Sequence, residues 1–318
     1  MIKRFQLSIL LAFLLSFVGQ AQITDTVKKV SDTLLIPAGI MTPAQMDSIA
    51  KTEEAIAYRK NHTDFYVLRK GRLFASWGYN RANYSQSSIR FWGNGYDFTI
   101  INAVAKDRPS PVDLGVYLNP TLFTIPQYNF RIGYFITNKL SLSLSVDHMK
   151  YVFVNDQIAA VDGYVDSSAS AKWAKEYDPT RLMEIPNDFV GYEHTDGLNV
   201  LSFELDYNTL FFETSNRKFA VDLVAGAGIS AAVPKTNANL FGEIGNDAFH
   251  LSGGGISANV GLKLYFFKDF FIHPVVKMGW LHMPNVATNG LEIDKASQNI
   301  SYFQRNITIG YQYKIAHK

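Results

Sequence analysis

The sequence predicts an all-β protein, a closed antiparallel transmembrane barrel of about eight to ten strands with a short helical N-terminal extension. Apolar and polar residues alternate with a period of two over most of residues 71–318. Short polar turns alternate with long connections, as in barrels whose turns lie on one side of a membrane and whose loops lie on the other. Aromatic residues make up 14% of the chain, which fits strands that carry Tyr and Phe at the bilayer surfaces.

The N-terminal residues 1–21 match a secretory signal peptide. Two basic residues precede an apolar stretch, and Gly19-Gln20-Ala21 supplies the small residues that a signal peptidase requires. The next region, 22–70, is predicted as a periplasmic extension. It contains a favourable helix start at Thr42-Pro43, with a Thr cap and Pro in the first turn. Residues 71–318 then form the barrel domain.

Composition limits the possible partners. Without the two basic residues of the signal, 28 Lys+Arg balance 28 Asp+Glu, so the mature chain is formally neutral and nucleic acid is not an expected partner. The absence of Cys excludes disulfides, thiolate metal sites and a Cys nucleophile. No cofactor is expected.

The alternation divides the barrel domain into eight preferred strands. They lie near residues 88–102, 126–136, 139–154, 197–213, 217–232, 252–267, 270–283 and 300–315. Residues 72–79 and 158–165 also alternate, and with them the barrel would have ten strands. The predicted short turns are 137–139, 214–217 and 268–269, and the predicted long connections are 103–123, 155–195, 233–250 and 284–299.

The last strand alternates without a break from Ile307 to Ile315. Its Thr308-x-Gly310-x-x-Tyr313-x-Ile315 resembles the insertion signal that the barrel assembly machinery reads. With the signal peptide, the alternation and the turn–loop pattern, residues 71–318 resemble the small outer-membrane β-barrel proteins of Gram-negative bacteria. The resemblance implies location in the cell outer membrane and contact with outer-membrane lipid, lipopolysaccharide and the assembly machinery.

Strand parity directs a set of charged residues into the lumen. The set comprises Arg131, Glu204, Asp206, Asp222, Lys263 and Lys277, together with His273 and Lys314. An eight-stranded barrel is only wide enough for its own side chains, and buried charges must be paired. An ion-pair network that plugs the barrel is therefore favoured over a selective pore.

Four residues near the predicted outer rim form a candidate site: Asp147, His148, His194 and Asp196. The segment around His194 resembles the His-x-Ser-Asn segment of outer-membrane phospholipase A and lipid A deacylase, but Asp196 stands where that family has its Ser nucleophile. No catalytic residue is assigned for this reason. A divalent-cation site of Asp147, His194 and Asp196 is less favoured than hydrogen bonds that hold the long loop in place.

The sequence thus favours a non-enzymatic envelope protein that has a structural role or binds a protein partner or ligand through its long surface loops. A lipid acyl hydrolase and a narrow, porin-like solute channel are the alternatives.

Overall fold

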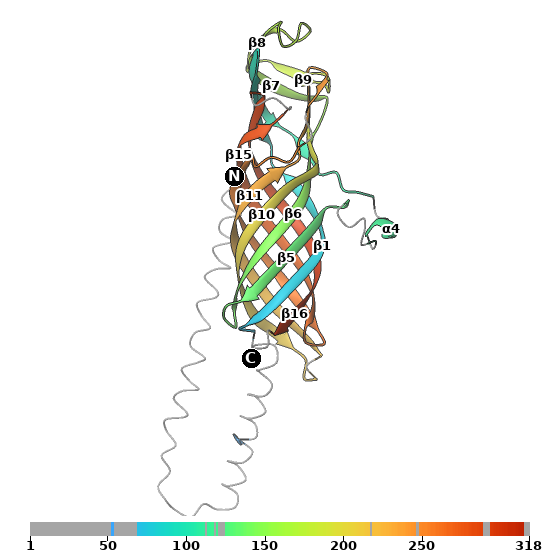
Figure 1. Cartoon of the computed structure of the whole chain (residues 1–318), viewed down its shortest axis with the longest axis vertical. Coiled ribbons are helices and arrows are strands. Elements are labelled where there is room, and N and C mark those ends of the chain that lie inside the picture. Colours follow the sequence, from blue (N-terminus) through green and yellow to red (C-terminus); the bar gives the residue numbers. More distant parts are fainter. Residues whose placement is uncertain are drawn as a thin grey trace, which may run out of the picture. The chain divides into compact units, whose positions relative to one another are not determined.

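The computed structural model describes residues 52–53, 69–111, 113–117, 119, 125–216, 218–245, 248–288 and 293–314. All strands belong to one compact unit, Lys60–Lys318 (Figure 1). The predicted signal peptide 1–21 lies outside the described residues. So does the predicted extension 22–70, apart from the helical Thr52 and Glu53 and the barrel-proximal Arg69 and Lys70.

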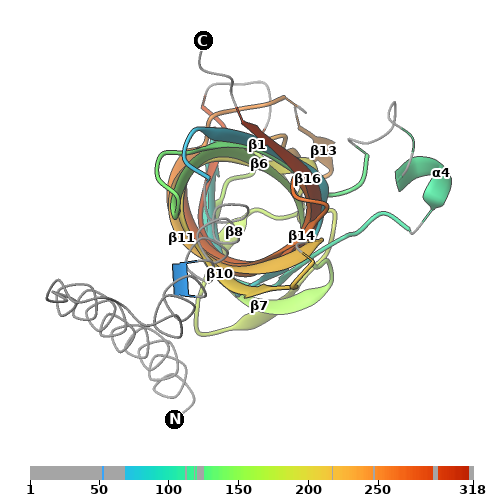
Figure 2. The ribbon, with the colours of Figure 1, turned by 90° about the horizontal axis from the view of Figure 1, so that it is seen from below.

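Eight antiparallel strands form a ring, seen along its axis in Figure 2. They are β1 (Arg72–Tyr84), β5 (Tyr128–Phe135), β6 (Leu140–Phe153), β10 (Val190–Glu213), β11 (Phe219–Pro234), β14 (Gly253–Phe266), β15 (Phe270–Ala287) and β16 (Lys295–Lys314). Each pairs with the next in this order, and β1 pairs with β16 from Arg72↔Lys314 to Tyr84↔Tyr302. The eight-stranded ring agrees with the preferred strand count.

The membership of the ring differs from the prediction at its first strand. Segment 72–79, which was predicted as a strand only in the ten-stranded alternative, forms most of β1. Predicted strand 88–102 lies outside the ring, as a hairpin of β2 (Ser87–Gly93) and β3 (Tyr96–Ala103). The reason is the turn at Asn94-Gly95, where Gly95 has φ +81° and reverses the chain. Segment 158–165, the other strand of the ten-stranded alternative, is part of β7 (Gln157–Val165), which pairs with β3 and does not belong to the ring.

The two ends of the ring differ in their connections. At one end, the turn end, β5 joins β6, β10 joins β11 and β14 joins β15 through short connections, as predicted. At the other, the loop end, the predicted long connections 155–195 and 233–250 contain further strands. These are β7, β8 (Lys175–Tyr177), β9 (Leu182–Ile185), β12 (Asn237–Leu240) and β13 (Glu243–Ile244). The stretch between β3 and β5 contains β4 (Ala105–Lys106) and α4 (Leu114–Tyr117).

These additional strands extend the sheet beyond the ring. β2 pairs with β16 and leads to β3, β7 and β8, while β9 pairs with β7, β12 with β10 and β4 with β6. We call this part the cap: β2, β3, β4, β7, β8, β9, β12 and β13 with residues 149–153, 190–200, 281–287 and 295–302 of the ring strands. A membrane strand needs about 9–11 residues. β10 has 24 and β16 has 20, so both are long enough to cross a bilayer and continue into the cap.

The inward side chains of one strand change character between ring and cap. In β6 every odd residue from Ser141 to Phe153 is buried. Towards the turn end they are Ser141, Ser143, Ser145 and Asp147, and towards the loop end they are Met149, Tyr151 and Phe153. The odd residues of β6 therefore point inward along its whole length, while their side chains change from polar to apolar.

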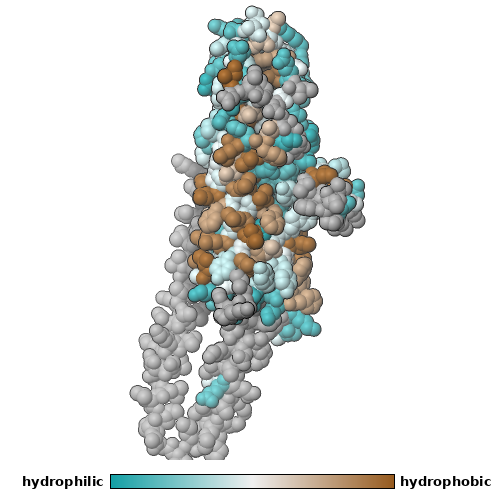
Figure 3. All heavy atoms as spheres, in the orientation of Figure 1, coloured by the Kyte–Doolittle hydropathy of each residue, from teal (hydrophilic) through white to brown (hydrophobic). Residues whose placement is uncertain are grey.

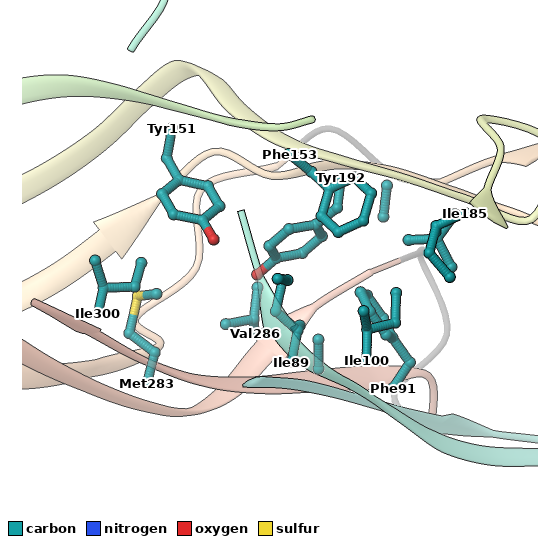
Figure 4. Packing of buried hydrophobic residues seen from close by; sticks show 14 of the residues in the cluster. Ile89, Phe91, Ile100, Tyr151, Phe153, Ile185, Tyr192, Met283, Val286 and Ile300 are labelled. Atoms are coloured by element: carbon teal, nitrogen blue, oxygen red, sulfur yellow. The ribbon is translucent and has the colours of Figure 1, made fainter. Parts of the chain in front are cut away.

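The cap has an apolar core of its own (Figure 4). Phe91 from the β2–β3 hairpin packs edge-to-face against Tyr192 of β10, with ring centroids 5.4 Å apart, and Ile100, Met283 and Ile300 belong to the same core. Phe98 stacks against Phe91 and Phe189, with ring centroids 5.5 and 5.1 Å apart. Burial of such aromatic and aliphatic groups is the main stabilising contribution in a domain surrounded by water.

The outside of the ring is apolar. Brown apolar side chains gather over the ring in Figure 3, whereas the cap is mostly teal. Residues exposed on this apolar belt include Leu144, Leu201, Phe203, Leu205, Ile229, Ile256, Val260, Met278, Trp280, Ile307, Ile309, Tyr311 and Tyr313. On β16 the exposed apolar positions run from Phe303 to Tyr313, interrupted once by Arg305, and this span matches the length of a membrane-crossing strand. Within the described residues, no helix is long and apolar enough to cross a membrane.

Candidate functional site

A network of buried charges fills the middle of the ring. Lys277 of β15 donates to Asp147 of β6 and to Glu204 of β10, both at 2.5 Å. Arg131 of β5 pairs with Glu204 and, at 3.0 Å, with Asp206. These side chains are at most 9% exposed, so each charge depends on its partner for solvation.

A second group of charges lies closer to the turn end. Arg69, which precedes β1, pairs with Asp222 of β11 at 2.5 Å. The amine of Lys263 on β14 donates to Asn208 Oδ1 at 3.1 Å and lies 4.5 Å from the centre of the Phe74 ring. Arg69 thus belongs to the lumen network although it falls in the predicted extension.

Aromatic rings close the turn end of the lumen. Phe74, Phe135, Tyr265 and Phe271 are buried together. The rings of Phe74 and Phe271 occupy the space where a Cβ would lie on Gly133 and on Gly310. Gly310 of the terminal strand therefore has a packing role in addition to its place in the predicted insertion signal.

All six predicted lumen charges of the first group (Arg131, Glu204, Asp206, Asp222, Lys263 and Lys277), and His273, lie buried inside the ring. Lys314 does not join them, because it is exposed as the last residue of β16. Between the network and the apolar core of the cap, the ring interior is occupied by its own side chains. Such an interior can hold strands in register and exclude solvent, as expected for a barrel of this size.

Three of the four candidate rim residues, Asp147, His148 and His194, do not converge. Asp147 lies in the lumen, bonded to Lys277 and Asn129. His194 lies in the core of the cap, where its Nδ1 is 3.0 Å from Thr236 Oγ1. The register places His194 opposite Tyr151 and Asp147 opposite Val200, several residues apart along β6. The side chain of Asp196 lies outside the described residues, and no metal-binding group of three His, Asp or Glu occurs in the described part of the chain.

His148 points outward, to the wall of the ring. Its ring stacks on Tyr128 with centroids 5.0 Å apart and planes 11° from parallel. Its Nδ1 lies 2.8 Å from Oδ1 of Asn199 on β10. Asn199 is an amide and cannot act as a nucleophile, so this contact does not reproduce a His–Ser pair.

Two arginines lie in the part of the belt nearest the cap, where Arg305 stands between Phe303 and Ile307 on β16. Arg81 and Arg305 face each other across β1 and β16. Arg305 donates to Asn83 at 3.1 Å, a residue nearer the loop end, and Arg81 donates to the Tyr117 hydroxyl at 3.3 Å. Long basic side chains that turn away from an apolar belt are typical of a membrane surface.

Comparison with known proteins gives structural neighbours only. No family model matches the chain, and no curated protein matches it. Among solved structures it is similar to the outer membrane protein OprG from Pseudomonas aeruginosa, with a TM-score of 0.40 and 10% identity over 79% of this chain and 100% of that one. It is also similar to the outer membrane protein AlkL (TM-score 0.35, 13% identity, 79% and 94% covered).

A third similar structure is the N-terminal β-barrel domain of OprF from P. aeruginosa, with a TM-score of 0.28 and 13% identity over 77% of this chain and 98% of that domain. OprG and AlkL are outer-membrane proteins by their descriptions, and the third structure is described as a β-barrel domain. The TM-scores lie below 0.5, and the features of this chain that fit a membrane are its own apolar belt and polar lumen.

Proposed function

We propose that this chain is an integral outer-membrane protein whose eight strands form a closed barrel across the bilayer. The exposed belt of about 11 residues on β16 supports this placement, because such a surface requires lipid as its solvent. The turn end then faces the periplasm and the cap faces the cell exterior, in keeping with short periplasmic turns and larger external segments.

We propose further that the barrel holds the cap at the cell surface for a structural or partner-binding role. The observation that carries this proposal is the plugged lumen: Lys277, Asp147, Glu204 and Arg131 fill its middle with ion pairs. A narrow solute channel would need these charges in contact with water. An acyl hydrolase would need an accessible nucleophile beside a histidine. His148 contacts the amide of Asn199, and the hydroxyl that His194 contacts, on Thr236, is buried with it inside the cap, away from any lipid substrate.

The partners follow from this placement and remain proposals. The barrel would contact outer-membrane lipid and lipopolysaccharide through its belt. The assembly machinery would act on the terminal strand, and a protein partner would bind the cap. Nucleic acid is not among the expected partners, because the mature chain is formally neutral.

Three measurements on the full chain test the proposal. Refolded protein should migrate faster on unboiled than on boiled gels, as folded barrels do. In planar bilayers it should give no stepwise conductance, whereas regular steps would establish a channel. Added phospholipid and lipid A should release no fatty acid, and release that is lost in His148→Ala or His194→Ala would establish a hydrolase.

Orientation has a separate test. Lys172 and Lys175 lie on exposed parts of the cap, so trypsin added to intact cells should cleave there. Cleavage only after the outer membrane has been permeabilised would place the cap in the periplasm and contradict the proposed role.

A further inference from the structure

Two arginines of the outer wall differ from the other arginines in the described part of the chain. Six of the others form ion pairs with carboxylates: Arg69, Arg72, Arg90, Arg108, Arg131 and Arg181. Arg81 on β1 donates instead to the Asn80 carbonyl at 2.8 Å and to the Tyr117 hydroxyl. Arg305 on β16 donates to the amide oxygen of Asn83. Both positive charges are thus without an ion pair among the described residues.

These two charges lie side by side. Arg81 and Arg305 are directly opposite each other in the β1–β16 pairing, where Cβ atoms are about 5 Å apart. Like charges at such positions repel each other and destabilise a sheet. Arg305 is exposed and Arg81 is half-buried on the outer wall, and a charge on a lipid face is unfavourable in itself. An anion between the two guanidinium groups would reduce both costs.

The carboxylate that acts on Arg81 belongs to Asp107, and it is engaged in other hydrogen bonds. Its two oxygens accept from the backbone N–H of Ala82 at 3.1 Å and from the side-chain amide of Gln127 at 2.7 Å. Within the described residues, it forms no ion pair with Arg305. Asp107 therefore offsets part of one charge and does not bridge the two.

The remaining surroundings of the pair provide no bridging carboxylate within the described chain. The outward neighbours on β1, β15 and β16 are uncharged: Tyr79, Asn83, Val276, Phe303 and Ile307. The connection between Arg108 and Gln127 contains one acidic residue, Asp113, whose side chain accepts from the backbone N–H of Gly115 at 2.8 Å. An anion that bridges the pair would therefore be a ligand.

Arg81 is held in its orientation by its neighbours. The Tyr117 hydroxyl donates to the Ser110 carbonyl at 3.1 Å, and its oxygen accepts from Arg81 at 3.3 Å. The Tyr79 ring packs against the Tyr117 ring, with centroids 4.5 Å apart. An oriented guanidinium loses less conformational entropy when it binds an acceptor. Each guanidinium carries more N–H groups than these contacts use, so both arginines retain donors for a shared anion.

Toward the turn end, the wall next to the arginine pair is apolar. Tyr79 faces Ile307 in the adjacent outward row, and Trp77 faces Ile309 in the row after it. Ile307 is 56% exposed and Ile309 is 51% exposed. The same stretch of wall thus presents two cations near the cap and apolar side chains further into the belt.

We propose that Arg81 and Arg305 together bind one phosphate group of an acyl lipid in the leaflet next to the cap, with an acyl chain along Tyr79 and Ile307. Guanidinium groups match a phosphate, because each can donate parallel hydrogen bonds to its oxygens. The phosphate offsets the repulsion between the arginines, and the apolar wall favours a lipid over a free anion. The proposal rests on the membrane placement proposed above.

The test uses folded full-length protein in micelles of an uncharged detergent, with diphosphorylated lipid A as the probe and the dephosphorylated lipid as comparison. Native mass spectrometry should show the phosphorylated lipid retained about tenfold more strongly. Arg81→Gln combined with Arg305→Gln should reduce its retention about tenfold. The matched control combines Arg90→Gln with Arg181→Gln, exposed arginines of the cap that have carboxylate partners, and should change nothing.

Asn83→Asp tests the site without removing either arginine. The new carboxylate would stand where Arg305 already donates and would compete with a bound phosphate. Retention of the phosphorylated lipid should fall several-fold. Heat-modifiable migration should persist, because Asn83 is exposed.

Thermal unfolding separates binding from a purely structural role of the arginines. Without lipid, Arg81→Gln combined with Arg305→Gln should be at least as stable as the unaltered protein, because the repulsion is removed. Diphosphorylated lipid A should raise the melting temperature of the unaltered protein and leave that of the double variant unchanged.

Several results would overturn the proposal. Equal retention of both lipids, or equal loss in both arginine pairs, would show bulk lipid contact only. Complete competition by an equal concentration of inorganic phosphate would assign a site for a free anion. A double variant that is already less stable without lipid would show that the arginines act through their contacts within the chain. Failure of the unaltered protein to fold in lipid or detergent would instead contradict the proposed membrane placement.

Discussion

In the ring, β6 directs Ser145 and Asp147 into the lumen, where Asp147 pairs with Lys277. A few residues further along the same strand, in the cap, Met149 and Tyr151 enter an apolar core. Both interiors are built by the same alternation, and both exclude solvent. They differ in the chemistry that holds them together. The ring depends on paired charges, and the cap depends on packed aromatic and aliphatic groups.

The difference shows how the external solvent determines the internal composition. In the proposed membrane, lipid solvates the apolar outward side chains of the ring, so its polar residues must face inward. Around the cap, water solvates the polar outward side chains, and the apolar ones form the core. One strand can serve both regions because side-chain direction is set by parity alone.

The largest effect is expected for Lys277→Met in the ring. The substitution leaves Asp147 and Glu204 buried without the amine that bridges them. Removing one partner of a buried ion pair costs about 3–5 kcal/mol. Urea-induced unfolding of the barrel in lipid vesicles should show this loss in the free energy of unfolding.

Lys314→Met provides the matched control, because Lys314 is exposed; its effect should stay within about 0.5 kcal/mol. Adding Asp147→Asn and Glu204→Gln to Lys277→Met should recover part of the stability. If Lys277→Met alone costs less than about 1 kcal/mol, the network does not hold the ring together.

A similar but local effect is expected in the cap for Phe98→Ala. Phe98 is 1% exposed and contacts Phe91, Phe189 and Phe241. Loss of such a ring costs about 3–5 kcal/mol through lost burial and the cavity that remains. The cap should become sensitive to protease while the barrel keeps its heat-modifiable migration.

Leu182→Ala is the control for the cap, because Leu182 is 70% exposed there, and protease resistance should persist. Loss of heat-modifiable migration in Phe98→Ala would mean that ring and cap unfold as one cooperative unit, and would contradict the expectation that each region is stabilised by its own interior.

The outer surfaces of the two regions can be compared at equal exposure. Ile307 on the belt is 56% exposed and Ile158 on the cap is 62% exposed. Ile307→Lys should cost about 2–4 kcal/mol, because it places a charge on the lipid face. Ile158→Lys should cost less than about 0.5 kcal/mol, because water surrounds the cap. Equal effects in vesicle unfolding experiments would show that the belt does not face lipid.

Much of the ring could be predicted because alternation is a local signal. The terminal strand from Ile307 to Tyr313 has the predicted outward residues, and the turns between ring strands lie where they were expected. The first ring strand was assigned wrongly because 72–79 and 88–102 alternate equally well. Both pair with the distant β16, and only the further pairing of β1 with β5 places 72–79 in the ring.

The cap was missed because the long connections were interpreted as loops. One local signal was available: the odd residues of β6 change from Ser145 and Asp147 to Met149 and Tyr151 without a change of parity. Asp147 and His194 do not meet, for a related reason. His194 and Asp147 share a face but occupy different levels, which only the register between β6 and β10 reveals.

The smallest predicted effect is a pH dependence confined to the cap. Burial lowers the pKa of His194 from its usual 6.5 to about 3. The unfolded cap takes up a proton as pH falls below 6.5, and the folded cap does not, so stability is lost as pH falls toward 3. Between pH 7.5 and 5.5 this histidine should remove about 1.4 kcal/mol from the free energy of unfolding.

Protease resistance of the cap at graded urea concentrations, compared at pH 7.5 and 5.5, measures this loss. His194→Phe should remove it, because an uncharged ring of similar size binds no proton. His282→Phe, on the exposed face of β15, should leave it unchanged. An equal pH dependence in the unaltered protein and in His194→Phe would show that His194 is hydrated in the folded cap, and that the cap interior is less apolar than its packing indicates.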